Sequence, residues 1–226
     1  MKIMIIIGIM MMVLVGCDVS PQEDAALRVT LTDIATTVAE ITVPTVDFSI
    51  GGIHLALPHP QKWESYTTEY GIVLAEQLGS VATEGQLGGI LIHLFVPPLD
   101  GVTLPISEES NRALSILTEI LAHPDYVGDA TVSRPLPFIW DNLDCAYYLM
   151  DNGEGNLTIV IGILDPLSNK LVTVSVSAPA QDETRIREHL PVLLDNLHIN
   201  DKTLSGKTLE EILPNPLIFP RHDEAS

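Results

Sequence analysis

The spacing of apolar and polar residues predicts β-strands over much of the chain. The clearest alternation lies in KLVTVSVSAP (residues 170–179), where Val172, Val174 and Val176 fall on one side and hydroxyl-bearing residues on the other. That pattern predicts a half-buried strand. GGILIHLFVP (residues 88–97) is instead apolar almost throughout, which predicts a strand covered on both faces.

Further strands are expected on either side of these two runs. DFSIGGIHLALP (residues 47–58) reads as a strand with a Gly-Gly bulge or turn, and residues 63–77 as one or two strands broken near Gly71. Residues 137–150 and 156–165 precede the alternating strand and are separated from each other and from it by turn-forming segments rich in Gly, Asn and Asp. Together these last three strands predict an antiparallel meander.

Two segments have the apolar spacing of helices. In residues 107–123, Ser107 is a good N-cap, Glu108 and Glu109 suit the positive end of the helix dipole, and Pro124 ends the segment. In residues 182–200 an apolar residue recurs on one face, with Pro191 as a kink. The order is strands, helix, meander and helix, which predicts an α+β domain with a mainly antiparallel β-sheet flanked by helices.

The N-terminal apolar run is of a different kind. Residues 3–16 carry no charge after Lys2, and a helix of that length spans roughly 21 Å at about 1.5 Å per residue, against a hydrocarbon core of about 30 Å. It is too short for a comfortable membrane span and has the length of a signal-peptide core. The run ends in Leu14-Val15-Gly16-Cys17.

This ending resembles the lipobox of bacterial lipoproteins. The resemblance implies that residues 1–16 are a lipoprotein signal peptide, that the chain is cut before Cys17, and that Cys17 carries the acyl chains that bind the membrane. More than one chain is needed for stable anchoring. Asp18 resembles the signal for retention at the inner membrane of bacteria with two membranes. In bacteria with one membrane the protein would lie on its outer face.

The rest of the chain divides by composition. Residues 17–45 are rich in Thr, Ala and Asp and are expected to form the lipidated N-terminus and a flexible tether, with a short helix inside it as an alternative. Residues 46–200 hold the predicted strands and helices of a single α+β domain. Residues 201–226 are expected to form a partly packed C-terminal tail, because they carry Ile218 and Phe219.

Charge narrows the possible partners. The formal net charge is −19. Such an acidic chain should be repelled by nucleic acid, so no nucleic-acid partner is expected. Plain solubility of an exported protein is the simplest explanation, and a basic partner surface is the alternative.

Residues capable of catalysis or metal binding show no convincing pattern. If Cys17 is lipidated, Cys145 stands alone in an apolar run beside Asp141 and Asp144, which suits a buried thiol better than a nucleophile. The seven histidines form no closely spaced pair, although His54 and His59 could meet across a bend. No catalytic, cofactor-binding or metal-binding residue is therefore predicted, and no cofactor.

Three glycine-containing segments share features with ligand-binding loops. LSGKT (residues 204–208) ends like a phosphate-binding loop, but Asp201 stands where its first glycine is needed. GEG (residues 153–155) fails as a dinucleotide motif because Thr158 occupies the third glycine position. DNGEGN (residues 151–156) reads as a hairpin turn, with a calcium loop as the weaker alternative.

Aromatic residues are few. Tyr147 and Tyr148 are adjacent in a predicted strand, so they face opposite sides of it, and one of them could line a surface groove.

Two stretches resemble the PsbP-like and Mog1-like domains. LALPHPQKWES (residues 55–65) is similar to their early strand-and-bend motif, with Pro60 and Trp63 at the expected spacing and His59 in place of the usual aromatic residue. Residues 171–199 are similar to their closing strand and helix. The resemblance covers about residues 47–200. It implies an α/β/α sandwich with an antiparallel sheet, an accessory or assembly role, and no shared catalytic residues.

The sequence therefore predicts a lipid-anchored, extracytoplasmic, non-catalytic binding or accessory protein of the bacterial cell envelope, acting on a membrane complex or envelope protein. Two alternatives remain open. One is an extracytoplasmic enzyme, such as a hydrolase that uses distant carboxylates with His93 or His123. The other is a small-ligand-binding lipoprotein.

Overall fold

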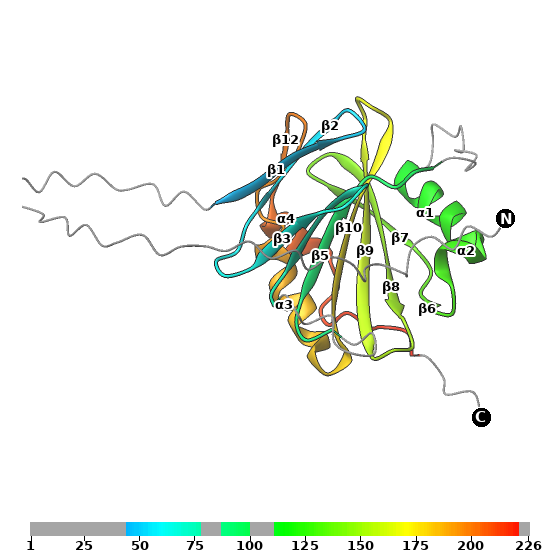
Figure 1. The fold of residues 1–226 in the computed structure, drawn as a ribbon. Coiled ribbons are helices and arrows are strands. Elements are labelled where there is room, and N and C mark those ends of the chain that lie inside the picture. The colour runs from blue at the N-terminus through cyan, green and yellow to red at the C-terminus, as the bar shows by residue number, and fades with distance from the viewer. Residues whose placement is uncertain (1–43, 78–86, 100–110, 222–226) are drawn as a thin grey trace, which may run out of the picture. The chain divides into compact units, whose positions relative to one another are not determined.

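The computed structural model describes residues 44–77, 87–99 and 111–221. Every described residue belongs to one compact unit, residues 43–226 (Figure 1). Cys17 and the proposed helix start at Ser107 lie outside the described residues.

The described part of the chain contains twelve strands and four α-helices. The strands are β1 (Thr45–Ile50), β2 (Ile53–Pro58), β3 (Glu64–Thr67), β4 (Gly71–Ala75), β5 (Leu91–Phe95), β6 (Thr131–Val132), β7 (Leu136–Trp140), β8 (Leu143–Asp151), β9 (Asn156–Asp165), β10 (Lys170–Pro179), β11 (Leu197–Ile199) and β12 (Lys202–Leu204). The helices are α1 (Arg112–Ala122), α2 (Pro124–Val127), α3 (Glu183–Leu193) and α4 (Gly206–Ile212), with a short 3-10 turn, η1 (Ala180–Asp182), before α3.

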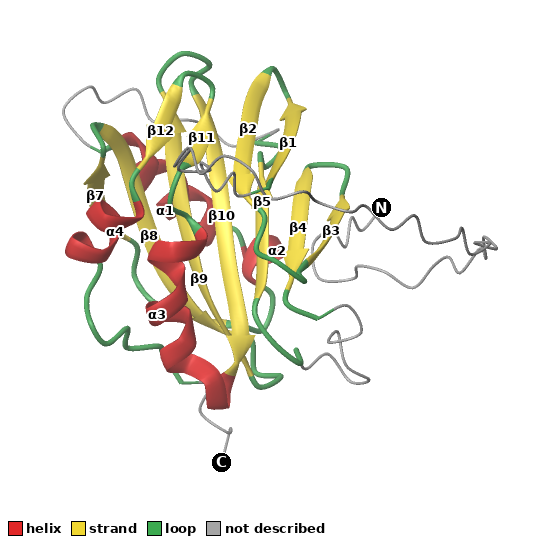
Figure 2. Ribbon diagram, turned by 90° about the vertical axis from the view of Figure 1, so that its left-hand side faces the viewer, coloured by secondary structure: helices red, strands yellow, loops and turns green. Residues whose placement is uncertain are grey.

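The strands form two antiparallel sheets. The large sheet has the order β3-β4-β5-β10-β9-β8-β6, with β7 also paired to β8, and the small sheet has the order β1-β2-β11-β12. The meander β8-β9-β10 is present as predicted. Helices α3 and α4 lie on one side of the large sheet and α1 on the other (Figure 2). The predicted fold class, α+β with a mainly antiparallel sheet flanked by helices, is confirmed.

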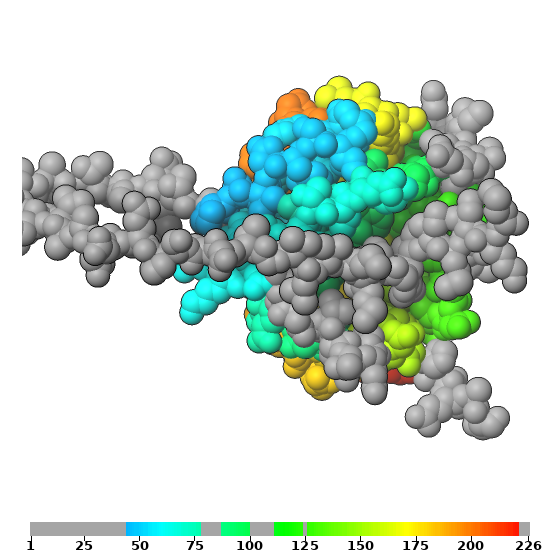
Figure 3. All heavy atoms as spheres, in the orientation of Figure 1, coloured from blue at the N-terminus to red at the C-terminus, as the bar shows by residue number. Residues whose placement is uncertain are grey.

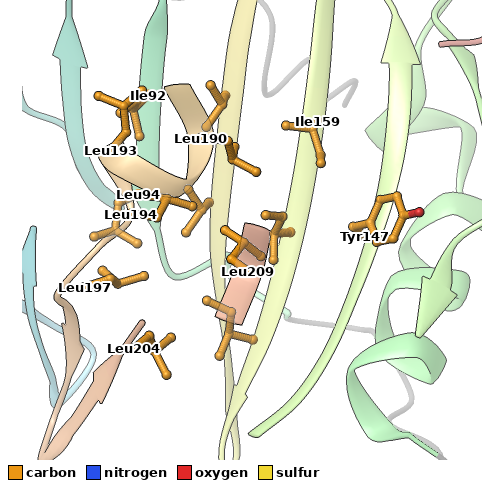
Figure 4. Close-up of a cluster of buried hydrophobic side chains, with 14 of the residues drawn as sticks. Ile92, Leu94, Tyr147, Ile159, Leu190, Leu193, Leu194, Leu197, Leu204 and Leu209 are labelled. Atoms are coloured by element: carbon orange, nitrogen blue, oxygen red, sulfur yellow. The ribbon is translucent and has the colours of Figure 1, made fainter. Parts of the chain in front are cut away.

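The side of the large sheet that faces α3 is aliphatic. Alternate side chains of β5, β10 and β9, among them Leu94, Val174 and Ile161, are fully buried here. The leucines of α3 pack onto them, and those of β11, β12 and α4 complete the layer (Figure 4). We call this surface the aliphatic face. Fully burying one such side chain contributes roughly 1.5–3 kcal/mol, so this layer dominates the stability of the domain.

Helix α1 packs on the opposite side through a smaller apolar cluster. Its Ala113, Ile116 and Leu117 contact buried residues of β8, β9 and β10. Gly162 lies beneath it, and a Cβ there would come within 3.2 Å of Leu117. The missing side chain therefore lets the helix approach the sheet closely.

Helix α1 begins later than the sequence predicted. Its N-cap is Asn111, whose Oδ1 accepts a hydrogen bond from Leu114 N at 2.9 Å. The Asn111 Nδ2 donates to the carbonyl oxygens of Phe138 and Cys145. The Asn111 side chain therefore both caps α1 and ties the helix to β7 and β8.

Two predicted strands are in fact hairpins. Gly51 and Gly52, with φ of +57° and +82°, form the turn between β1 and β2, which excludes the bulge. Asp141 and Asn142, also at positive φ, form the turn between β7 and β8. A two-residue turn with both residues at positive φ matches the twist of the strands it joins.

The domain extends past residue 200, where the sequence suggested that a tail begins. Strand β12 completes the small sheet, and helix α4 packs against α3. The residues after α4 also add Leu213, Leu217 and Phe219 to the core, whereas Ile218 is exposed.

Polar contacts link the small sheet to the large one. The β1–β2 turn lies beside the β9–β10 turn (Figure 3), and Lys170 Nζ donates to Gly51 O. The buried Asp165 carboxylate accepts from Asn200 Nδ2 at 3.0 Å, and Asn200 in turn bonds the backbone of His54. A satisfied buried carboxylate of this kind fixes how the turns meet.

Candidate functional site

The side of the large sheet that carries α1 is polar where α1 does not cover it. Strand register places six side chains in one row across β3, β4, β5, β10, β9 and β8. They are, in that order, Tyr66, Val73, His93, Ser175, Val160 and Tyr148. Directly paired residues in antiparallel strands point to the same side, so these six share one side of the sheet. Val73 and Val160 are buried there, and the other four are partly exposed.

Neighbouring rows add further hydroxyl and apolar groups. The residues are Leu91, Phe95, Thr158, Thr173 and Ser177. These eleven residues together are called the polar face. In the described part of the chain, the main helix contacts on this side are those of α1 with β8 and β9. Because the polar face lies on the paired strands of the sheet, its hydroxyl groups are held at fixed positions.

The burial of β5 contradicts one prediction from the sequence. Strand β5 was predicted to be covered on both faces, but Leu91, His93 and Phe95 are only half-buried, whereas Ile92 and Leu94 are fully buried. The alternation predicted for β10 is confirmed, with Val172, Val174 and Val176 on the aliphatic face and the hydroxyls on the polar one.

His93 lies at the centre of the polar face. Its ring stacks on Phe95, with centroids 4.4 Å apart, and its Nε2 lies 3.5 Å from Thr68 Oγ1. Burial lowers the pKa of His93 to about 4, so the ring is neutral near pH 7. Within the described ranges, no carboxylate forms an ion pair or a hydrogen bond with His93.

His123, the other histidine considered for catalysis, has different surroundings. It caps the C-terminus of α1, and its Nε2 lies 3.7 Å from Glu119 Oε1. Its ring also makes an edge contact with Tyr126. The described contacts therefore do not join His93 and His123 into one acid–base pair.

The tyrosines supply neutral hydrogen-bonding groups. Burial raises the pKa of Tyr148 to about 12 and also raises that of Tyr66, so both hydroxyls stay protonated. Tyr147 points to the aliphatic face, where its ring meets Phe138 edge-on. Of the two adjacent tyrosines, Tyr148 is thus the one on the candidate surface.

One buried hydroxyl of the polar face has no hydrogen-bond partner among the described residues. Thr173 Oγ1 is fully enclosed and makes no hydrogen bond with any described residue, whereas Thr158 Oγ1 lies 2.8 Å from Ser177 Oγ. An unpaired buried hydroxyl costs free energy. Overall the face offers neutral donors, acceptors and aromatic rings, which suits recognition of a neutral polar surface.

Cys145 is a core residue. It lies on the aliphatic face, fully buried, and burial raises the pKa of its thiol well above the ordinary value. The carboxylates of Asp144 and Asp141 act in the same direction. The thiol therefore stays protonated, as the sequence indicated.

The histidines are not gathered into a metal site in the described structure. His54 Nδ1 lies 3.5 Å from Asp47 Oδ1, and the backbone of His59 bonds Pro44 O instead. Among the residues that the structure describes, no three His, Cys, Asp or Glu side chains are placed to hold a metal ion.

The glycine-containing segments have structural roles. Ser205 caps α4, and the carboxylates of Asp141 and Asp195 accept from the backbone N–H groups of Ser205 and Gly206 at 2.6 and 2.8 Å. The chain's own carboxylates thus occupy the donors that a phosphate would need. DNGEGN is the β8–β9 turn, and Asp151 Oδ1 accepts from Gly153 N at 3.0 Å.

No described helix is long and apolar enough to cross a membrane.

Comparisons with known proteins return structures only. No protein-family model matches the chain, and no curated protein matches it. The cyanobacterial PsbP protein CyanoP from Synechocystis sp. PCC 6803 is 11% identical with a TM-score of 0.42, covering 70% of this chain and 93% of its own. The Ran-binding protein Mog1p of Saccharomyces cerevisiae is 11% identical with a TM-score of 0.36, covering 66% and 84%. The protein of unknown function PA94 from Pseudomonas aeruginosa is 6% identical with a TM-score of 0.33, covering 76% and 99%.

Both families that the sequence resembles are represented among these structures, at low identity and low TM-score.

Proposed function

We propose that the protein is a lipid-anchored, extracytoplasmic, non-catalytic binding protein of the bacterial cell envelope. The observation that carries this proposal is the charge-free run that ends in Leu14-Val15-Gly16-Cys17. Acyl chains on Cys17 would hold the chain at the membrane: at the inner membrane, from Asp18, if the cell has two membranes, or on the outer face of a single membrane.

Anchoring at the membrane would bring the domain close to its partner. Residues 18–43 separate Cys17 from the first described residues of the domain. A flexible connection of that length would keep the domain close to the membrane and raise its effective concentration for partners embedded there. Affinity for such a partner can then be modest.

The polar face is the surface we assign to the partner, which would be a membrane complex or another envelope protein. Its groups are neutral at pH 7 and stand on rigid strands, with Tyr66 and Tyr148 at the two ends of the row. Tyrosine combines an apolar ring with a hydrogen-bonding tip, a composition that favours protein interfaces.

The anchor is tested by replacing Cys17 with serine. The wild-type chain should fractionate with membranes and take up labelled palmitate, and Cys17→Ser should lose both properties because serine lacks the acylated thiol. Cys145→Ala is the matched control, since it removes the other cysteine, which is buried, and should leave labelling intact. Membrane attachment that survives in the Cys17→Ser chain would refute the anchor.

The binding surface is tested in the lipidated chain with a photo-cross-linking amino acid. Placed at Ser177 on the polar face, it should capture a reproducible protein, and placed at Thr203, exposed on the small sheet, it should not. Capture should also fall in the Cys17→Ser chain. Equal capture from both positions would contradict the assignment of the polar face.

A further inference from the structure

The free edge of the small sheet is a second candidate interaction surface. Strand β1 lies at the outer end of this sheet, and β2 is its only partner strand in the described structure (Figure 2). An edge strand presents unpaired N–H and C=O groups, and proteins protect such edges with short strands, proline, lysine or bulges. The other edge strands of the two described sheets have such protection, since β3, β6 and β12 have four, two and three residues and β7 contains Pro137.

Strand β1 has none of these protections. It is six residues long, contains no proline or lysine, and pairs with β2 over all six residues without a bulge. The two-residue turn makes Ile50 and Ile53 a hydrogen-bonded pair, so the N–H and C=O groups of every second residue back from Ile50 point to β2. The same groups of Thr45, Asp47 and Ser49 point away from β2 and form no hydrogen bond with any described residue.

The side chains of β1 are incompletely covered as well. Val46, Phe48 and Ile50 face the core and pack against it, but all three are only partly buried. The side chains between them are exposed on the outer surface of the sheet. A strand added beside β1 would satisfy the outward backbone groups and would cover the apolar row with its own alternate apolar residues.

We propose that this added strand is β1 of a second copy of the chain, running antiparallel to the first. The strand is self-complementary in the register that places Phe48 opposite Phe48 of the second copy. Asp47 then lies opposite Ser49 of the second copy, and the outward N–H and C=O groups of these two residues bond to each other. Val46 lies opposite Ile50 of the second copy, so the apolar rows of the two copies continue one surface.

Charge selects this register. The net charge of −19 disfavours contact between copies, but β1 carries a single charged side chain, that of Asp47. A shift of two residues would place Asp47 opposite Asp47, and like charges directly opposite each other are destabilising. In the proposed register the carboxylate instead meets the Ser49 hydroxyl, which can donate to it. The pair of opposed Phe48 rings adds an aromatic contact that only a second copy supplies.

This pairing depends neither on the anchor nor on the polar face, and it is tested by disulfide cross-linking of the full-length chain in whole cells. One strand pair buries less area than a stable dimer needs, so a covalent trap is required. In a Cys145→Ala background, Phe48→Cys should form a linked dimer when an oxidant is added. Opposite residues of this kind have Cα atoms about 4.5 Å apart, which is within disulfide range. The background chain alone measures any dimer formed through Cys17.

A second set of variants tests the register. Differently tagged chains that carry Asp47→Cys and Ser49→Cys are produced together and should link to each other more than either links to itself. Thr203→Cys is the control for random collision, because Thr203 is exposed on β12 at the opposite edge of the same sheet. Its dimer should form at least about tenfold more slowly than that of Phe48→Cys, although its thiol is the more exposed, because no partner thiol is held opposite it.

A proline tests the backbone pairing. Ser49→Pro removes an outward N–H that β2 does not use, and proline is tolerated in edge strands for this reason. The chain should keep its circular dichroism spectrum and lose the dimer of Phe48→Cys.

An undiminished dimer in the folded Ser49→Pro chain would overturn the proposal. So would a Thr203→Cys dimer that forms as fast as that of Phe48→Cys, or self-linking at position 47 that equals the link between positions 47 and 49. Linking of position 48 to a different protein, or to nothing, would also overturn it, because the edge would not then pair with a second copy.

Discussion

The two faces of the large sheet are made from the same strands but differ in almost every physical property. On the aliphatic face, β10 presents Val172, Val174 and Val176, all fully buried under α3 and the small sheet. One residue along the chain, the same strand presents Thr173, Ser175 and Ser177 to the polar face. The first face excludes water from a continuous core, whereas the second keeps hydroxyl groups and aromatic rings in a fixed array.

The difference suggests that stability and recognition are separated on this domain. Helices α3 and α4, the small sheet and the C-terminal residues all contribute to one side, so that side has little freedom to change. Helix α1 contributes only a small cluster on the other side. Substitutions on the polar face should therefore cost less stability, and the surface can be adapted to a partner.

The largest expected effect comes from one substitution made on both faces of β5. Leu94→Ala removes a fully buried side chain from the aliphatic face and should lower the free energy of unfolding by about 3 kcal/mol. Leu91→Ala makes the same change on the half-buried polar face and should cost about 1 kcal/mol or less, because less area is removed from contact. Urea unfolding followed by circular dichroism gives both values.

Equal losses from Leu94→Ala and Leu91→Ala would remove the distinction between the faces. Such a result would mean that the polar face is packed as tightly as the core.

The second expected effect is a dependence of the free energy of unfolding on pH, caused by His93 on the polar face. Burial lowers the pKa of His93 from its ordinary value of 6.5 to about 4. The unfolded chain therefore takes up a proton at higher pH than the folded chain does. Stability is lost as the pH falls from about 6.5 to about 4, by about 2 kcal/mol after allowance for the half-buried position of the ring.

Comparing His93→Gln with the wild type separates the loss of stability due to His93 from that due to the titration of the carboxylates. Unfolding free energies measured at several pH values should show a weaker dependence in the variant between pH 6.5 and 4. A dependence as steep as that of the wild type would mean that His93 is not buried in the neutral form.

Much of this contrast could be read from the sequence, but only one strand at a time. The Val/Thr-Ser alternation in residues 170–179 gave the correct two-faced strand. The apolar run around His93 led to the wrong prediction that β5 is covered on both faces, because apolar composition does not reveal which side of a strand a helix will cover. The N-cap at Asn111 was missed as well, since its contacts to Phe138 and Cys145 are with residues distant in the sequence.

The candidate surfaces depend on register and could not be predicted in advance. His93 and Ser175 are neighbours only because β5 pairs with β10, 82 positions apart in the chain at these residues. The small sheet could not be predicted either, because β11 and β12 have only three residues each. The buried Arg187 likewise donates to the backbone carbonyls of Pro214 and Glu210, which no local pattern indicates.

The smallest expected effect distinguishes two hydroxyls within the polar face itself. Thr173→Val replaces a buried hydroxyl that has no described partner with a methyl group of similar shape, and should stabilise the domain by about 1 kcal/mol. Thr158→Val should instead destabilise it by about 1 kcal/mol, because Ser177 Oγ loses its partner. Thermal unfolding of the two variants should shift in opposite directions. If Thr173→Val is also destabilising, the Thr173 hydroxyl has a partner such as a bound water, and the polar face is then wetter than its neighbouring strands suggest.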